Sequence, residues 1–145
     1  MDETPLAVAE TFALRFRGNA NSLAMAYGGP MFLVGSVLTS LEPGDIDLRL
    51  ILERTEMEAL FGKDFDSHGL EWSPAKWRVE REQLKQSRRL TRRWRGGCPA
   101  WRFDFQFQCG LNSDVDGLPI MHEGKPWLRL DTVPLSYFTA GKGDP

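Results

Sequence analysis

Two aspartates separated by one residue, Asp45 and Asp47, have the spacing in this chain that most clearly suggests chemistry. They open the segment DIDLRLIL, in which charged and apolar residues alternate with the period of a β-strand. Residues i and i+2 of a strand project from the same face, so the two carboxylates would lie side by side. Such a pair needs a cation, and carboxylate oxygens suit hard ions such as Mg²⁺.

A third carboxylate, Asp104, lies in the most regular alternation of the chain, WRFDFQFQ. We expect a strand with one aromatic face, Trp101, Phe103, Phe105 and Phe107, and one polar face, Arg102, Asp104, Gln106 and Gln108. If this strand neighbours the Asp45–Asp47 strand, three carboxylates converge. Three carboxylates can hold two metal ions and so stabilise both the entering and the leaving oxygen in phosphoryl transfer.

The dipeptide Gly35-Ser36 is separated from Asp45 by eight intervening residues and follows the short apolar run MFLV. That run predicts a buried strand, and Ser36 is predicted to cap a short helix that ends at Leu41. A strand that ends in glycine and turns into a helix exposes backbone N–H groups, which together with the helix dipole favour phosphate. Gly35 and Ser36 are therefore candidate nucleotide-binding residues.

Together these segments resemble the nucleotidyltransferase superfamily, specifically the minimal nucleotidyltransferases related to DNA polymerase β. The resemblance rests on LVGS, on DIDL and on FDF around Asp104, and it covers about residues 31–108. It implies that Gly35 and Ser36 bind the triphosphate and that Asp45 and Asp47 hold the bridging metals. It also implies that Asp104 binds the second metal and helps to deprotonate an acceptor hydroxyl.

The resemblance implies an Mg²⁺- or Mn²⁺-dependent enzyme that moves a nucleoside monophosphate from an NTP such as ATP to a hydroxyl and releases pyrophosphate. The acceptor stays open among an RNA end, a protein and a small molecule. A second copy of the chain or a partner protein could complete the site.

Each of these residues also has a purely structural interpretation. Asp45 and Asp47 could form the polar face of an edge strand beside Arg49, Asp104 could belong to a solvated face, and Ser36 could be a plain helix cap. On that interpretation the chain is a catalytically inactive binding protein of the same fold, such as a toxin–antitoxin component or a nucleic-acid adaptor. A nuclease or phosphohydrolase is a weaker third hypothesis.

Charge is concentrated in one segment. The chain has a formal net charge of -2, yet nine Lys or Arg and two Glu lie between Lys76 and Arg95, a local charge of +7. Ser73 and Pro74 predict the start of a helix that runs to about Trp94. Its basic face comprises Arg78, Arg81, Lys85, Arg88 and Arg92, and its sheet-facing side comprises Ala75, Val79, Gln83, Gln86, Leu90 and Trp94.

The basic face is either a solvated surface or a binding surface for a triphosphate or an RNA acceptor. Arg88 and Arg92 are the candidate nucleotide-binding residues on it. Trp77 and Leu84 flank this face, and we expect them to pack against the C-terminal segment rather than to stack on bases.

The remaining patterns predict a helix over about residues 6–25 interrupted at Gly18-Asn19, and a short helix from Thr55 to Phe61 capped by Thr55 with Glu58. A strand is expected at Pro126 to Asp131. The fold class is therefore α/β (α+β): one domain, residues 1–145, in which a small mixed sheet is flanked by helices and followed by a short C-terminal β appendage.

Two features bear on the compartment. The chain has no run of 18 apolar residues and no basic start followed by an apolar stretch, so we expect neither membrane insertion nor a secretory signal. Cys98 and Cys109 form no disulfide framework and are expected to be small buried residues. These features favour a cytoplasmic location.

Overall fold

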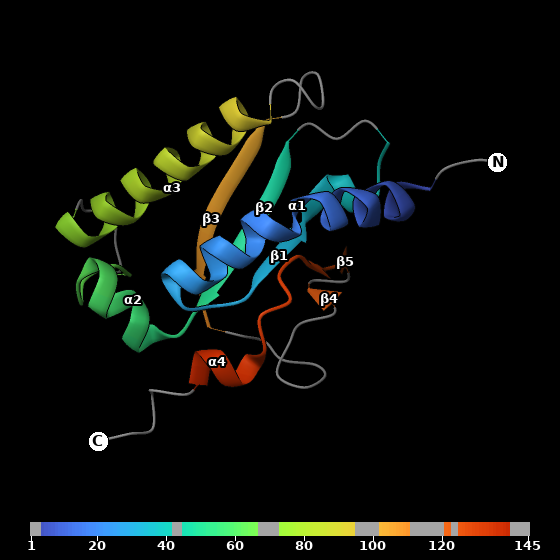
Figure 1. Ribbon diagram of the computed structural model, residues 1–145. Coiled ribbons are helices and arrows are strands. Elements are labelled where there is room, and N and C mark those ends of the chain that lie inside the picture. The colour runs from blue at the N-terminus through green and yellow to red at the C-terminus, as the bar shows by residue number, and fades with distance from the viewer. Residues whose placement is uncertain are drawn as a thin grey trace.

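The computed structural model describes residues 4–41, 45–66, 73–94, 102–110, 121–122 and 125–139. Its centre is a four-stranded mixed sheet in the order β3-β2-β1-β6, and Figure 1 labels the first three of these strands. The pair β1 and β2 is antiparallel, β3 runs parallel to β2, and β6 is antiparallel to β1. The strands are β1 (Met31–Val34), β2 (Ile46–Leu52), β3 (Phe103–Cys109) and β6 (Leu128–Arg129). The predicted α+β class with a small mixed sheet is confirmed.

Helices join and cover these strands. A helix leads into the sheet, a 3₁₀ turn follows β1, and two helices separate β2 from β3 (Figure 1). These are α1 (Pro5–Tyr27), η1 (Gly35–Leu38), α2 (Arg54–Phe61) and α3 (Pro74–Arg93), with α4 (Leu135–Thr139) near the C-terminus. Among the described residues, none of these helices is long and apolar enough to cross a membrane.

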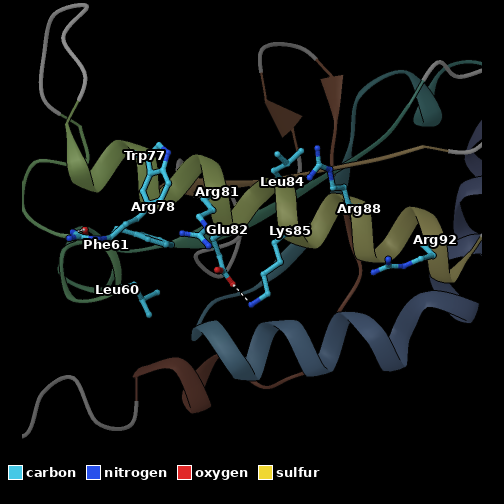
Figure 2. A pocket seen from close by; sticks show the side chains of 10 residues that line it. All are labelled: Leu60, Phe61, Trp77, Arg78, Arg81, Glu82, Leu84, Lys85, Arg88 and Arg92. Carbon is cyan, nitrogen blue, oxygen red and sulfur yellow. Dashed lines mark hydrogen bonds and ion pairs between the residues drawn. The ribbon is translucent and has the colours of Figure 1, made fainter.

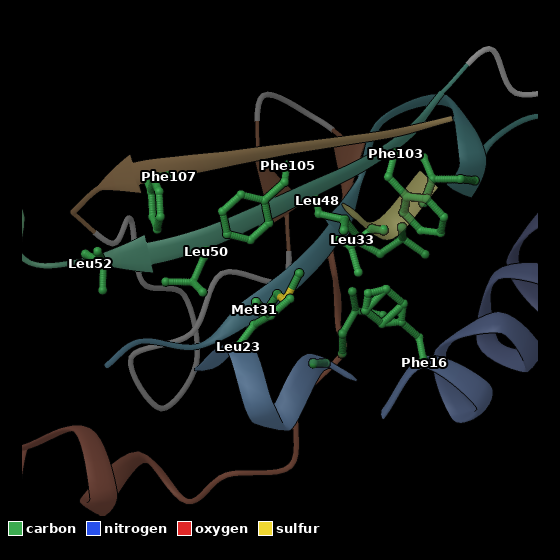
Figure 3. Packing of buried hydrophobic residues seen from close by; sticks show 14 of the residues in the cluster. Phe16, Leu23, Met31, Leu33, Leu48, Leu50, Leu52, Phe103, Phe105 and Phe107 are labelled. Carbon is green, nitrogen blue, oxygen red and sulfur yellow. The ribbon is translucent and has the colours of Figure 1, made fainter. Parts of the chain in front are cut away.

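The core lies between one face of the sheet and the helices (Figure 3). Alternation in β2 and β3 turns Leu48, Leu50 and Phe105 to this face, where all three are fully buried. α1 adds Phe12 and Phe16, whose rings contact each other and Phe103. The predicted aromatic side of the β3 strand is thus confirmed for Phe103, Phe105 and Phe107, whereas Trp101 lies outside the described residues.

The second face of the sheet carries the residues of opposite parity. Phe32, Val34 and Ile51 form a small buried cluster there, against which Trp127 packs. Asp47, Asp104 and the other polar residues of β2 and β3 lie on this same face, and they are only partly buried. The helices therefore pack on the core face of the sheet, and the polar residues lie on the opposite face.

The helix α1 is continuous, and the predicted interruption at Gly18-Asn19 is wrong. A helical glycine costs about 1 kcal/mol relative to alanine. Burial of Phe16 and Ala20 on either side of Gly18 offsets that cost. The helix begins after Thr4, whose hydroxyl accepts from the Ala7 N–H at 3.1 Å, and ends at Gly28 with φ of 93°.

The cap of α2 also differs from the prediction. Glu53 precedes the helix and forms a capping box with Glu56, whose side chain accepts from the Glu53 N–H at 3.1 Å. The helix therefore begins at Arg54, one residue before the predicted cap Thr55. The prediction for α3 is confirmed, since Ser73 accepts from the Lys76 N–H at 3.1 Å and Pro74 lies in the first turn.

The C-terminal segment is not a simple appendage. β4 (Met121–His122) and β5 (Lys125–Pro126) form a separate two-stranded sheet, but β6 joins the main sheet through β1. The predicted strand at Pro126 to Asp131 is therefore split. Asp131 fastens the segment, because its buried carboxylate accepts from the Met31 N–H at 2.8 Å and pairs with Arg129.

Candidate active site

Asp47 and Asp104 lie side by side. They are register partners in the parallel pair β2–β3, and neighbouring strands are about 4.8 Å apart. Their flanking residues Ile46, Leu48 and Phe105 are fully buried on the core face, so both carboxylates project from the second face. The structure thus brings together two of the three predicted carboxylates.

The surroundings of this pair disfavour the negative charge of Asp47. Burial raises the pKa of Asp47, the negative charges of Asp104 and Asp45 raise it further, and Arg49 acts in the opposite direction. Gln106 donates a hydrogen bond to the Asp104 carboxylate at 3.1 Å. Two close carboxylates with incomplete compensation fit a hard divalent cation, which would neutralise them.

Gly35 approaches the Asp47 carboxylate closely. Its φ is +85°, and a Cβ at this position would lie 2.3 Å from Asp47 Oδ2. Only glycine combines this backbone conformation with this contact. The turn after β1 therefore places its backbone directly against one member of the carboxylate pair.

Ser36 follows Gly35 and is exposed. The predicted capped helix to Leu41 is instead the 3₁₀ turn η1, and the prediction that Ser36 caps it is wrong, because the turn has no side-chain cap. The Ser36 carbonyl accepts from the N–H groups of Thr39 and Ser40 at 3.1 and 2.8 Å, which closes the turn. Ser36 is thus an exposed residue of this turn, directly after Gly35.

Asp45 stands apart from the pair. It precedes β2 rather than forming part of it, and its Oδ1 lies 3.9 Å from Nε of Arg102. The two side chains are 47% and 78% exposed, so this ion pair is weak. In the part of the chain that the structure describes, no three His, Cys, Asp or Glu residues are arranged to hold one metal ion. The three-carboxylate centre therefore stays a prediction.

A groove of about 350 Å³ between α3 and β3 connects Asp45 and Asp104. Arg102 and Phe103 line it from the strand side, and Gln83, Leu84 and Ser87 line it from the helix. Asp45 therefore borders the same space as Asp104 although its carboxylate faces Arg102.

A ladder of side chains holds β3 against α3. Gln83, Ser87 and Thr91 accept hydrogen bonds from the backbone N–H groups of Phe107, Phe105 and Phe103, each at 2.9 Å. Every fourth residue of the helix meets every second residue of the strand, because four helical residues rise about 6 Å and two strand residues span about 6.6 Å. We call these three residues the edge ladder. They accept from backbone N–H groups on the outer edge of β3 and so hold in place the strand that carries Asp104.

Sequence reasoning placed Gln83 on the sheet-facing side of the helix but missed the ladder. The signal was a polar residue with an oxygen acceptor at every fourth position, 83, 87 and 91, on a helix followed by an alternating strand.

The basic face of α3 is confirmed as exposed, while Ala75, Gln86 and Leu90 are buried on the opposite side. A groove of about 850 Å³ follows this face, with Arg88 and Arg92 at one end (Figure 2). Neither arginine lines the groove that holds Asp104. Their predicted role in nucleotide binding together with Gly35 and Ser36 therefore stays a prediction.

Three apolar or sulfur side chains are more exposed than predicted. Trp77 and Leu84 are 45% and 49% exposed rather than packed under the C-terminal segment. Cys109 is exposed rather than buried: alternation places it on the same side of β3 as Phe107, but it is the last residue of the strand. Cys98 lies outside the described residues.

None of the protein-family models, curated proteins or solved structures compared with the chain matches it.

Proposed function

We propose that the chain is a metal-dependent nucleotidyltransferase that moves a nucleoside monophosphate from an NTP to a hydroxyl acceptor and releases pyrophosphate. The observation that carries the proposal is the adjacent pair Asp47 and Asp104 with Gly35 held against Asp47. The elements that carry these residues follow one another as the motifs behind the resemblance do: β1 leads into Gly35 and Ser36, β2 carries Asp47 and β3 carries Asp104.

The chain's own residues would divide the work. Asp47 and Asp104 would hold Mg²⁺ or Mn²⁺, which would supply positive charge to the phosphates. Gly35 allows the backbone to approach a phosphate closely, and the exposed Ser36 hydroxyl donates a hydrogen bond to it. Asp104, on the edge strand and beside the groove, accepts the proton of the acceptor hydroxyl.

Asp45 would join this pair as a metal ligand if its contact with Arg102 opened. Exposed ion pairs contribute at most about 1 kcal/mol, so a bound cation readily outweighs this one. The exposed free thiol of Cys109 fits a reducing compartment such as the cytoplasm.

The test is a transfer assay. The chain is incubated with Mg²⁺ or Mn²⁺ and each labelled NTP, with total RNA and cell lysate as acceptors, beside Asp47→Asn and Asp104→Asn. Gln108→Asn, on the same face of β3, is the matched control. We expect each Asp variant to lose at least about 100-fold in rate and the control to retain its rate. Label transfer that is equal in all four proteins would refute the proposal.

A binding protein without catalysis is the second candidate. The Asp45–Arg102 pair favours it, because that pair occupies a carboxylate that the metal centre would need. This candidate predicts that no NTP transfers its label and that binding of NTP does not depend on metal.

A further inference from the structure

The arginines of α3 form a surface that is largely free of acidic partners. Arg81, Arg88 and Arg92 project from the exposed side of the helix and make no ion pair with any residue that the structure describes (Figure 2). By contrast, Lys85 lies 3.8 Å from Glu82, and Arg78 donates to the Phe61 carbonyl at 2.9 Å. Glu82 also lines this groove, but its carboxylate faces Lys85, so the three guanidinium groups along the helix are suited to a run of anionic groups.

An aromatic ring accompanies this row. Trp77 is 45% exposed, and the Arg81 guanidinium lies 5.0 Å from the centre of its ring. Leu84, also exposed, stands between Arg81 and Arg88 (Figure 2). Flat apolar surface interleaved with arginine is how proteins bind unpaired bases together with their phosphates. An acidic protein partner would need the charges but not the ring.

The surface leads towards the carboxylates. The groove along the basic face shares Leu84, Arg88 and Arg92 with a neighbouring groove of about 480 Å³. That second groove shares Ser87, Arg102 and Phe103 with the groove that contains Asp104. Arg81 to Arg92 alone spans about 16 Å along the helix axis, which leaves room for more than one nucleotide.

We infer that this face of α3 binds single-stranded nucleic acid and directs the hydroxyl end of the strand to Asp104, so that the strand is the acceptor. The choice of acceptor rests on the proposed function, whereas the binding surface does not. The phosphates contact Arg81, Arg88 and Arg92, a base stacks on Trp77, and Arg102 guides the strand over the edge of β3.

The test begins with binding alone. The full chain is titrated into a fluorescent single-stranded RNA of about 12 nucleotides without NTP or metal, over a range of KCl concentrations. One variant is R81A/R88A/R92A. The matched control, R15A/R17A/K63A, removes the same number of exposed basic residues from other elements. Trp77→Ala is compared with Trp77→Phe, which keeps a ring.

We expect R81A/R88A/R92A to bind at least about 10-fold more weakly and to reduce the salt slope by about 2, because each phosphate contact contributes about 0.7. Trp77→Ala should lower the affinity for the RNA by about 5-fold or more, and Trp77→Phe should lower it much less. The inference would be overturned if both triple variants lost the same affinity for the single-stranded RNA. It would also be overturned if the wild type bound a poly-glutamate peptide or duplex RNA as tightly as it binds the single-stranded RNA.

The acceptor is tested with the same RNA after addition of Mg²⁺ and NTP. We expect labelled nucleotide on the RNA and its loss in R81A/R88A/R92A. Label on another acceptor but not on RNA would overturn the acceptor assignment and leave the proposed nucleotidyl transfer standing. RNA binding without any transfer would refute the proposed function and leave the binding surface standing.

Discussion

At the residue scale, Gly35 is the clearest link between sequence and site. Its left-handed backbone and its contact with Asp47 cannot be kept by any other residue. We expect Gly35→Ala to lower the free energy of unfolding by about 2 kcal/mol or more, because a left-handed residue with a Cβ costs about 1–2 kcal/mol before any clash. Chemical denaturation measures the difference.

Gly18→Ala is the matched control. Gly18 lies inside α1 with nothing within 4 Å of a Cβ built on it. The same substitution should stabilise the protein there by about 0.5–1 kcal/mol. Equal effects at the two positions would show that Gly35 is not constrained as described.

The carboxylate pair predicts that the stability of the fold depends on pH. The folded pKa of Asp47 is raised above its ordinary value of 3.8, mainly by burial and then by Asp104. The folded state therefore binds the proton more tightly than the unfolded chain does, and stability is lost as pH rises from the ordinary to the raised value. Asp47→Asn removes this penalty, so it should melt at a higher temperature than the wild type at pH 7.

The difference should vanish below pH 3.8, where the wild-type carboxyl is protonated in both states. Mg²⁺ should raise the melting temperature of the wild type at pH 7 and leave Asp47→Asn unchanged. A variant that is less stable than the wild type at pH 7 would contradict the proposed repulsion between Asp47 and Asp104.

At the element scale, the edge ladder is the feature that positions Asp104. Ser87→Ala would leave the Phe105 N–H without its partner, and an unsatisfied buried donor costs about 1–3 kcal/mol. Ser22→Ala on an exposed part of α1 should change stability by less than about 0.5 kcal/mol. Thermal melting compares the two, and faster amide exchange in β3 of Ser87→Ala would locate the damage.

Most elements could be predicted from periodicity, because the strands around Asp47 and Asp104 and the helix α3 have clear patterns. The errors have physical causes. Packing of Phe16 and Ala20 carried α1 through Gly18, and a glutamate rather than Thr55 capped α2. The pairing of β6 with β1 depends on the long-range contact of Asp131 with Met31, which local sequence does not encode.

The site was predictable to a similar degree. Adjacency of Asp47 and Asp104 follows once two alternating strands are assumed to be neighbours. The position of Asp45 was not predictable, because it depends on where β2 begins and on Arg102, which directly precedes the neighbouring strand β3. The edge ladder was also missed, since polar residues on a sheet-facing helix side have no obvious partner until the strand edge is placed beside them.

At the scale of the whole molecule, the charge division agrees with the two surfaces. The basic face of α3 is connected by neighbouring grooves to Asp104, one member of the carboxylate pair. A single basic helix on an otherwise acidic protein would orient an anionic strand before contact. This electrostatic steering would be strongest at low ionic strength.

The most direct test of the central claim is nucleotide binding itself, because it needs no knowledge of the acceptor. Calorimetry with a non-hydrolysable NTP analogue would compare the wild type with the Asp47→Asn/Asp104→Asn double variant, each with Mg²⁺ and with EDTA. We predict binding by the wild type that requires Mg²⁺ and weakens at least about 10-fold in the double variant. Binding that is unchanged by EDTA or by the double substitution would contradict a metal-dependent nucleotide site on this carboxylate pair.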